Sequence, residues 1–296
     1  MIYEKKLNIG YSAIGKQGIL KIVSIMNFLQ DTASEHAAHM GVSGFDLARK
    51  NLGWVIFRYH IEILDHPFWQ DKITIRTYRF SCRNLYEIRN LTITAENDKA
   101  RDTFPPDSSK EYSTENKKYQ DQTEYGTKNK NPGKKLVDAR ACWVMINKKN
   151  GRPVRLSRFM DDRNSCEHGD QGVDSCFPEI IKPEKIHYQL PFKVRMHDLD
   201  LNGHVNNAIF VEWAVETVPE EVLSRFFPAV IDVVFNKESL YGDTIISHTE
   251  ISKPSGLPIT YHSIIRQQDQ AELASLNICW HPLPQTEKRT PFEAIR

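Results

Sequence analysis

Hydrophobic and polar positions change period along the chain, and the changes outline two similar blocks. Between Ile22 and Gly41 apolar residues recur every three or four positions, which predicts one amphipathic helix that ends at a glycine cap. Alternating stretches follow and predict four strands, at residues 54–64, 72–80, 86–95 and 139–147. The first block is therefore expected to hold one helix and then a sheet.

The second block shows the same order of patterns. Residues 205–218 predict a helix, and alternating stretches then predict strands at residues 229–236, 243–251, 259–268 and 271–280. One helix against an antiparallel sheet, present twice, indicates an α+β fold rather than a parallel doubly wound one.

A faint internal repeat links the two blocks. Residues 61–75 align with residues 233–247, and Cys142 aligns with Cys279. The two cysteines are separated by fewer positions than the two aligned segments are. A polar insertion at residues 97–135, which lies between these landmarks in the first block only, accounts for most of that difference in separation. Because each copy of a sequence repeat forms the same structural unit, we expect two structurally similar halves.

Two polar segments divide the chain. Residues 97–135 are mostly charged or polar with almost no aliphatic side chains, so we predict a mobile surface insertion in a long hairpin loop. Residues 157–185 are polar and end at a proline-containing stretch, which is typical of an interdomain linker. The expected domains are then residues 1–156 and residues 186–296.

Composition limits which classes of partner the protein binds and indicates its cellular compartment. The chain has 39 Lys and Arg against 38 Asp and Glu, and this balance gives no overall field for nucleic acid or an anionic membrane. Its five cysteines are odd in number, scattered and never spaced as CxxC, which favours a reducing cytoplasm over a disulfide framework or a zinc ribbon. We expect a cytoplasmic protein with no signal peptide, no membrane span and no cofactor.

Candidate chemistry lies just before the second predicted helix. Asp200, Asn202 and His204 are spaced at every second position, so an extended backbone would point their side chains to one side. The helical pattern resumes at Val205, and the free N–H groups and positive dipole at a helix start stabilise developing negative charge. This arrangement favours a functional role for the trio over a purely structural one.

Two other interpretations compete for the same stretch. Asp200 and Asn202 can simply form a turn, and one of His204, Asn206 and Asn207 can cap the helix. A metal site would need His197, Asp198, Asp200 and His204 together, but no HxxxH or related ligand spacing accompanies them. We therefore expect no metal.

Residues 194–213, "VRMHDLDLNGHVNNAIFVEW", resemble the signature segment of the acyl-acyl-carrier-protein (acyl-ACP) thioesterases, and the chain looks like a bacterial-type member. Residues 235–243, "FNKESLYGD", resemble the companion strand, and the likeness extends over nearly the whole chain outside the insertion and linker. The resemblance implies a double (tandem) hot-dog fold, in which a sheet wraps each central helix. It also implies hydrolysis of fatty acyl thioesters on acyl carrier protein, which ends chain elongation with a free fatty acid.

The same resemblance implies catalytic roles for four residues. The catalytic Asp, Asn and His of the family correspond to Asp200, Asn202 and His204, and its acid on the following strand corresponds to Glu238. Plant members carry a cysteine at the next position, whereas this chain has Ser239, which favours a water-based or carboxylate-based mechanism.

Each of these four residues can perform a step that thioester hydrolysis requires. Glu238 can act as general base or as a nucleophile that forms an anhydride, and Asn202 can position the water or the carbonyl. His204 can donate to the oxygen or to the leaving sulfur, Asp200 can orient its neighbours, and N–H groups at the helix start can form an oxyanion hole.

The first half lacks this trio, so we expect it to supply the acyl pocket, with candidate lining residues Met26, Phe28, Leu29, Trp54 and Phe57. Acyl carrier protein is acidic, and a basic patch should receive it. Its candidates are Arg76, Arg79, Arg83 and Arg89.

Three alternatives stay open at this point. A hot-dog acyl-CoA thioesterase or a hydratase would use the same fold with another carrier or with elimination chemistry. A non-catalytic acyl-binding protein would keep the fold without the reaction. The sequence also leaves open whether the chain forms a homodimer.

Overall fold

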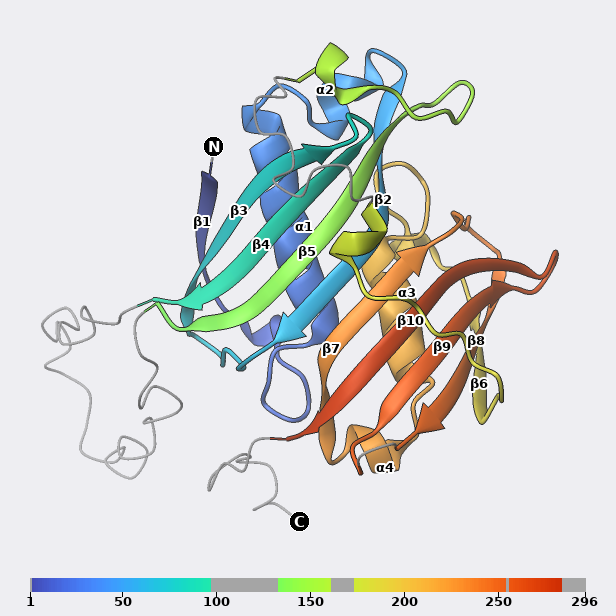
Figure 1. Cartoon of the computed structure of the whole chain (residues 1–296). Coiled ribbons are helices and arrows are strands. Elements are labelled where there is room, and N and C mark those ends of the chain that lie inside the picture. Colours follow the sequence, from blue (N-terminus) through green and yellow to red (C-terminus); the bar gives the residue numbers. More distant parts are fainter. Residues whose placement is uncertain (1, 97–132, 161–172, 254–255, 284–296) are drawn as a thin grey trace, which may run out of the picture.

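The computed structural model describes residues 2–96, 133–160, 173–253 and 256–283. Their ten strands form one antiparallel sheet in the order β1-β3-β4-β5-β2-β7-β10-β9-β8-β6 (Figure 1). Residues 97–132 of the expected insertion and residues 161–172 of the expected linker lie outside the described residues.

The elements of each half follow the same sequence. The first half contains β1 (Ile2–Asn8), α1 (Ile22–His39), α2 (Gly44–Ala48), β2 (Leu52–Ile63), β3 (Lys72–Cys82), β4 (Tyr86–Ala95) and β5 (Lys135–Asn147). The second half contains β6 (Tyr188–Lys193), α3 (Asn207–Glu216), α4 (Glu220–Leu223), β7 (Phe226–Phe235), β8 (Thr244–Ser252), β9 (Ile259–Arg266) and β10 (Ala271–Pro282). The two helices and eight strands expected from the sequence are all present, within a few residues at their ends.

The strand order confirms the internal repeat. The first half reads β1-β3-β4-β5-β2 and the second reads β6-β8-β9-β10-β7, which is the same order shifted by five strands. The halves join where β2 pairs with β7, and there His60 lies opposite Asp232. These two residues are 172 positions apart, the same spacing as between Asp71 and Asp243 in the aligned segments. Equivalent residues therefore face each other at the centre of the sheet.

One hydrophobic core runs through both halves. The helices α1 and α3 lie on the same side of the sheet and contact each other (Figure 1). Ile25 and Leu29 of α1 and Val211 of α3 are fully buried in one cluster. Because this burial removes the apolar stripe of each helix from water, the two halves stabilise each other. The domain boundaries at residues 156 and 186 stay a prediction.

Part of the expected linker packs on the sheet. Phe177 joins a buried cluster with Cys82 and Cys142, and the guanidinium of Arg58 lies 5.3 Å from the centre of its ring. The carbonyl of Cys176 accepts a hydrogen bond from Arg140 at 3.0 Å. This part of the segment therefore belongs to the packed structure.

None of the helices in the described residues has the length and apolar character needed to cross a membrane.

Candidate active site

The trio lies in a tight turn. The backbone N–H of Asp200 donates to the carbonyl of His204 at 2.7 Å, and residues 199 and 205 on either side pair as an isolated antiparallel bridge. Gly203 has φ +77°, a conformation that glycine adopts without steric cost. The prediction of an extended backbone was wrong, and the alternative of a turn is confirmed.

The carboxylate of Asp200 causes this local structure. It accepts hydrogen bonds from the backbone N–H groups of Asn202 at 2.8 Å and His204 at 3.2 Å, and from the side-chain amide of Asn202 at 3.3 Å. Such side-chain to backbone bonds compete with extended structure and favour turns. The turn still gathers the three side chains in one place.

The helix α3 begins directly after the turn. Asn206 is its N-cap, and the side-chain oxygen of Asn206 accepts from the N–H of Ala208 at 3.0 Å. The N–H of Val205 donates to the carbonyl of Ser239 at 3.0 Å, and the N–H of Asn206 donates to the carbonyl of Asp198 at 2.8 Å. Together with the turn, these bonds engage the N–H groups of residues 202–206 and of Ala208, so these groups do not form the expected oxyanion hole.

Glu238 reaches the turn from the loop between β7 and β8. Its Oε2 lies 3.2 Å from Nδ1 of His204, and the side chains are 66% and 36% exposed. The backbone hydrogen bond from Val205 to Ser239 holds the two loops side by side. The structure therefore brings all four expected catalytic residues into one cluster that a substrate can reach.

Arg266 anchors the loop that carries Glu238. Its guanidinium donates to the carbonyl of Glu238 at 3.3 Å, and it binds both carboxylate oxygens of Asp269 at 3.0 and 2.8 Å. Those hydrogen bonds lower the pKa of Asp269 to about 2. The same arginine lies 3.5 Å from Asp243.

Ser239 is not placed to act as a nucleophile. Its side chain is fully buried, and its hydroxyl donates to Oδ2 of Asp243 at 2.8 Å. The hydroxyl therefore stabilises the loop, and the water-based or carboxylate-based mechanism stays a prediction.

Sequence reasoning missed two residues in and beside the site, Lys148 and Arg195. Lys148, which follows β5 in the first half, donates from Nζ to Oδ1 of Asn202 at 3.0 Å. Asp198 is buried and accepts from the backbone and the guanidinium of Arg195, with the shortest of these contacts at 2.7 Å. Arg195 is close in sequence and could have been found from its i,i+3 spacing to Asp198, whereas no local pattern points to Lys148.

Within the part of the chain that the structure describes, no group of three or more His, Cys, Asp or Glu side chains is arranged to hold a metal ion. Asp198, which the metal interpretation required, is bound to Arg195 instead.

Family comparison matches both halves of the chain. The N-terminal domain of acyl-ACP thioesterases matches residues 1–102, and the C-terminal domain matches residues 181–282. The chain belongs to the acyl-ACP thioesterase family. The matched ranges follow the order of the two structural halves, and the catalytic candidates all lie in the second range.

Similar proteins support this assignment. The chloroplast acyl-[acyl-carrier-protein] hydrolase FATB2 of Cuphea viscosissima is 23% identical over 299 residues, which cover 95% of this chain but only 63% of that protein. A solved structure described as an oleoyl thioesterase from Lactobacillus plantarum matches with a TM-score of 0.73 at 21% identity, covering 96% of this chain and 98% of that chain. The 12:0-ACP thioesterase from Umbellularia californica matches with a TM-score of 0.72 at 17% identity, covering 95% and 94%. These structures share the fold, and the expected tandem hot-dog fold of this acyl-ACP thioesterase family member is confirmed.

The candidate acyl-binding residues of this family member do not share one surface. Met26 and Leu29 are buried in the common core, and Phe28 packs against it. Trp54 packs on a second cluster, where its Nε1 donates to the carbonyl of Val42 at 2.8 Å, and Phe57 packs on a third cluster around Cys82 and Cys142. The lining of an acyl pocket by these residues stays a prediction.

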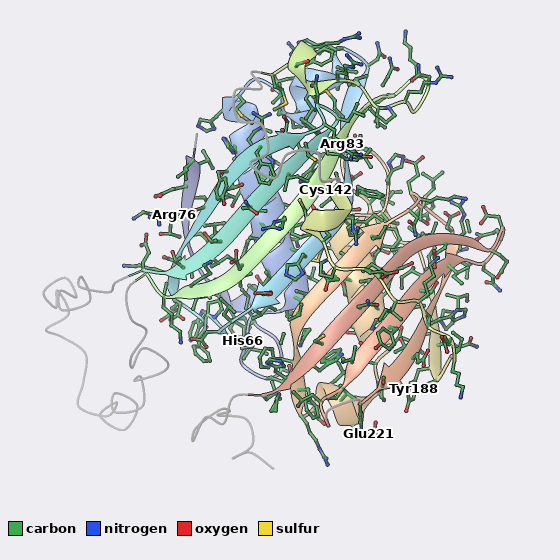
Figure 2. The ribbon with its side chains drawn as sticks, viewed as in Figure 1. His66, Arg76, Arg83, Cys142, Tyr188 and Glu221 are labelled. Carbon is green, nitrogen blue, oxygen red and sulfur yellow. The ribbon has the colours of Figure 1, made fainter. Side chains whose placement is uncertain are left out.

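Surface hollows do not locate that pocket either. Tyr188 and Glu221, which lie at the bottom of the second half in Figure 2, line a hollow of about 600 Å³ that contains none of the candidate residues. A second hollow of about 450 Å³, between Arg58 and Phe177, is also lined by none of them.

The expected basic patch was wrong for two of its four arginines. Arg79 and Arg89 are 9% and 3% exposed, so they cannot meet a carrier protein. Arg76 and Arg83 are exposed but lie well apart (Figure 2). Arg76 is also bound to Glu4 at 2.6 Å. The four arginines therefore do not form one surface.

Instead, Arg79 and Arg89 form a buried ionic cluster inside the first half. The carboxylate of Glu87 binds Nε of Arg79 at 2.8 Å and Nη2 of Arg89 at 2.6 Å, and Glu87 is 1% exposed. Burial, together with the charge of Arg89, lowers the pKa of His36 to about 4. His36 is therefore neutral near pH 7, and its Nδ1 accepts from Arg89 at 3.0 Å.

Proposed function

We propose that this protein is an acyl-ACP thioesterase, which hydrolyses the thioester of fatty acyl-ACP and so terminates fatty acid synthesis. Membership of the family in both halves supports the proposal. The observation that carries it is the 3.2 Å contact between His204 and Glu238, because it joins an acid from a separate loop to the turn of Asp200 and Asn202. A buried or scattered set of these side chains would have argued for a structural role.

The cluster supplies the groups that thioester hydrolysis requires. In one route the Glu238 carboxylate takes a proton from a water molecule, whose oxygen attacks the carbonyl carbon. The C–S bond of the resulting tetrahedral intermediate then breaks, and His204 gives a proton to the leaving sulfur. In the other route the Glu238 carboxylate attacks the carbonyl carbon, and the C–S bond breaks as His204 gives a proton to the leaving sulfur. Water then hydrolyses the resulting mixed anhydride to free fatty acid and the Glu238 carboxylate.

The tetrahedral intermediate also needs a donor for its oxyanion. Because the backbone N–H groups of residues 202–206 and of Ala208 already have acceptors, we assign this role to the side-chain amide of Asn202. Asp200 accepts one N–H of that amide, which leaves the other N–H for the substrate.

The test is release of free thiol from acyl-ACP and acyl-CoA substrates of graded chain length. We expect preferential turnover of the carrier-protein substrates, and a loss of at least about 100-fold in Asp200→Ala and Glu238→Ala. Glu221→Ala is the matched control, because it removes an exposed carboxylate from another part of the same half. Circular dichroism confirms that each variant is folded.

The alternatives give different results. Preference for acyl-CoA would indicate a hot-dog thioesterase for another carrier, and water addition without thiol release would indicate a hydratase. No turnover of any thioester, or turnover unchanged in both variants, would reject the proposal and favour acyl binding without catalysis.

Oxygen-18 labelling from the solvent tests for the anhydride route. In a single turnover in H₂¹⁸O, direct attack by water leaves Glu238 unlabelled, whereas hydrolysis of an anhydride at the glutamyl carbonyl places ¹⁸O in its carboxylate. Label found by mass spectrometry in the peptide that contains Glu238 establishes the anhydride route, because direct attack by water never places ¹⁸O there.

A cytoplasmic location is part of this proposal. The cysteines Cys82, Cys142, Cys176 and Cys279 carry free thiols, as proteins of a reducing compartment do.

A further inference from the structure

The active centre of the second half receives a side chain from the first. Lys148 follows β5, and its backbone N–H donates to the carbonyl of Asn51 at 2.8 Å, which fixes the start of the side chain. Its Nζ then reaches Oδ1 of Asn202 at 3.0 Å, across 54 positions of sequence. Among the candidate catalytic residues, Asn202 therefore has a cationic partner from the other half.

A glycine makes room for this lysine. Gly53 lies in β2 opposite Ile146 of β5. A Cβ atom added to Gly53 would lie 2.6 Å from Cε of Lys148, closer than real Cβ atoms approach a neighbour, so the flexible end of the lysine side chain would have to shift. The aliphatic stem of Lys148 therefore occupies the space that a side chain at position 53 would take.

The partners of Asn202 determine how its amide points. A lysine ammonium can only donate, and it faces the oxygen of the amide. A carboxylate can only accept, and Asp200 faces the nitrogen. With both partners in place, the amide presents its second N–H to a ligand, whereas a flipped amide would present its oxygen.

We propose that Lys148 is a positioning residue that holds the Asn202 amide with its N–H directed at the thioester carbonyl oxygen. This inference rests on the proposed function. The oxyanion of the tetrahedral intermediate is stabilised by an N–H and repelled by a carbonyl oxygen, so the orientation of this amide acts on the rate of reaction. Lys148 acts through Asn202 and need not touch the substrate.

Lys148→Met removes the ammonium and keeps the length of the side chain. We expect kcat to fall about 2- to 5-fold with little change in KM, because a hydrogen bond from a charged group at an exposed, solvent-screened site is lost. Lys148→Arg keeps a cationic donor and should restore much of the rate. Gly53→Ala should lower kcat in the same direction, because its new methyl group displaces the Lys148 stem.

Lys149→Met is the matched control. Lys149 is the next residue, is exposed, and has the same charge, so its loss reports any general effect of surface charge. Each variant is assayed on acyl-ACP and on a neutral acyl thioester of N-acetylcysteamine, which has no acidic carrier. A positioning role requires the fall in kcat on both substrates and leaves Lys149→Met at the wild-type rate.

Three results would overturn the inference. An effect confined to the KM for acyl-ACP would make Lys148 a contact for the carrier. An equal effect of Lys149→Met would reduce it to surface charge, and unchanged kcat in Lys148→Met with an active wild type would leave it without a role. If the wild-type protein hydrolyses no thioester at all, the proposed function fails first and this inference fails with it.

Discussion

The buried ionic cluster of the first half predicts one large loss of stability. Glu87→Gln preserves the shape of the side chain but removes the carboxylate charge that binds Arg79 at 2.8 Å and Arg89 at 2.6 Å. Both guanidinium groups would remain buried without that counter-charge, and the new amide would also turn N–H donors toward them. Removing one partner of a buried ion pair costs about 3–5 kcal/mol, and we expect Glu87→Gln to lie in that range.

The matched control is Glu4→Gln. Glu4 also binds an arginine, Arg76, at 2.6 Å, but the two side chains are 44% and 54% exposed. Water and salt screen an exposed pair, so its loss should cost about 0–1 kcal/mol. The two variants therefore make the same chemical change in two different environments.

Urea unfolding, followed by circular dichroism and tryptophan fluorescence, measures both variants. The shift in midpoint, multiplied by a common slope, gives the change in the free energy of unfolding. We claim that burial determines how much the ionic cluster contributes to stability. This claim would be refuted if Glu87→Gln lowered the free energy of unfolding by less than about 1 kcal/mol, or by as much as Glu4→Gln does.

Three further predictions test pH dependence and the insertion. Burial lowers the pKa of His262 to about 3, so the unfolded chain alone binds this proton between about pH 6 and pH 4. His262→Gln should therefore flatten the fall in unfolding free energy over that range by about 1.4 kcal/mol per pH unit in urea titrations, and an unchanged slope would contradict this. A hydrogen bond to Asp232 raises the pKa of His60, and the resulting stabilisation is present below about pH 6.5 and lost as the pH rises through the raised value. Asp232→Asn should thus destabilise the protein more at pH 6 than at pH 9, whereas equal losses would argue against a charged His60. Backbone hydrogen bonds already close the hairpin at Ala95, so replacing residues 97–132 with Asn-Gly should keep a cooperative thermal transition, and aggregation would reject the idea.

Periodicity recovered the elements that bury a clear apolar face. The stripe of α1 that includes Ile25 and Leu29 is fully buried, as its spacing predicts. The strands β1 and β6 were missed because they form the two edges of the sheet, where charged residues and Pro191 are tolerated and the apolar signal is weak.

The alternation of buried and exposed positions along β3 predicts that Arg79 is buried, although its charge suggests exposure. Arg79 shares its face of the strand with Ile73, Ile75 and Thr77, all of which are buried, so its burial follows from its position in the strand. Reading the arginine as exposed because it is charged was the error, since a carboxylate on the next strand satisfies it.

The sequence predicted those catalytic candidates that lie close together in the chain, but not the contacts that they make with distant residues. Asp200, Asn202 and His204 are adjacent in the chain and meet in one turn. The turn itself depends on bonds between a carboxylate and backbone N–H groups, which spacing does not reveal. The contact of Lys148 depends on how two distant segments pack, so no local pattern could predict it.

The pairing of His60 with Asp232 shows that duplication within one chain allows equivalent positions to hold different residues. In an assembly of two identical copies, residues that face each other across the symmetry axis must be the same, so an acid would meet an acid there. Here the two equivalent positions belong to one polypeptide and have diverged into a base and an acid that bind at 2.6 Å. The same freedom allows one half to carry the candidate catalytic side chains and the other to supply Lys148, so a single asymmetric cluster replaces the two identical clusters that a symmetric pair would build.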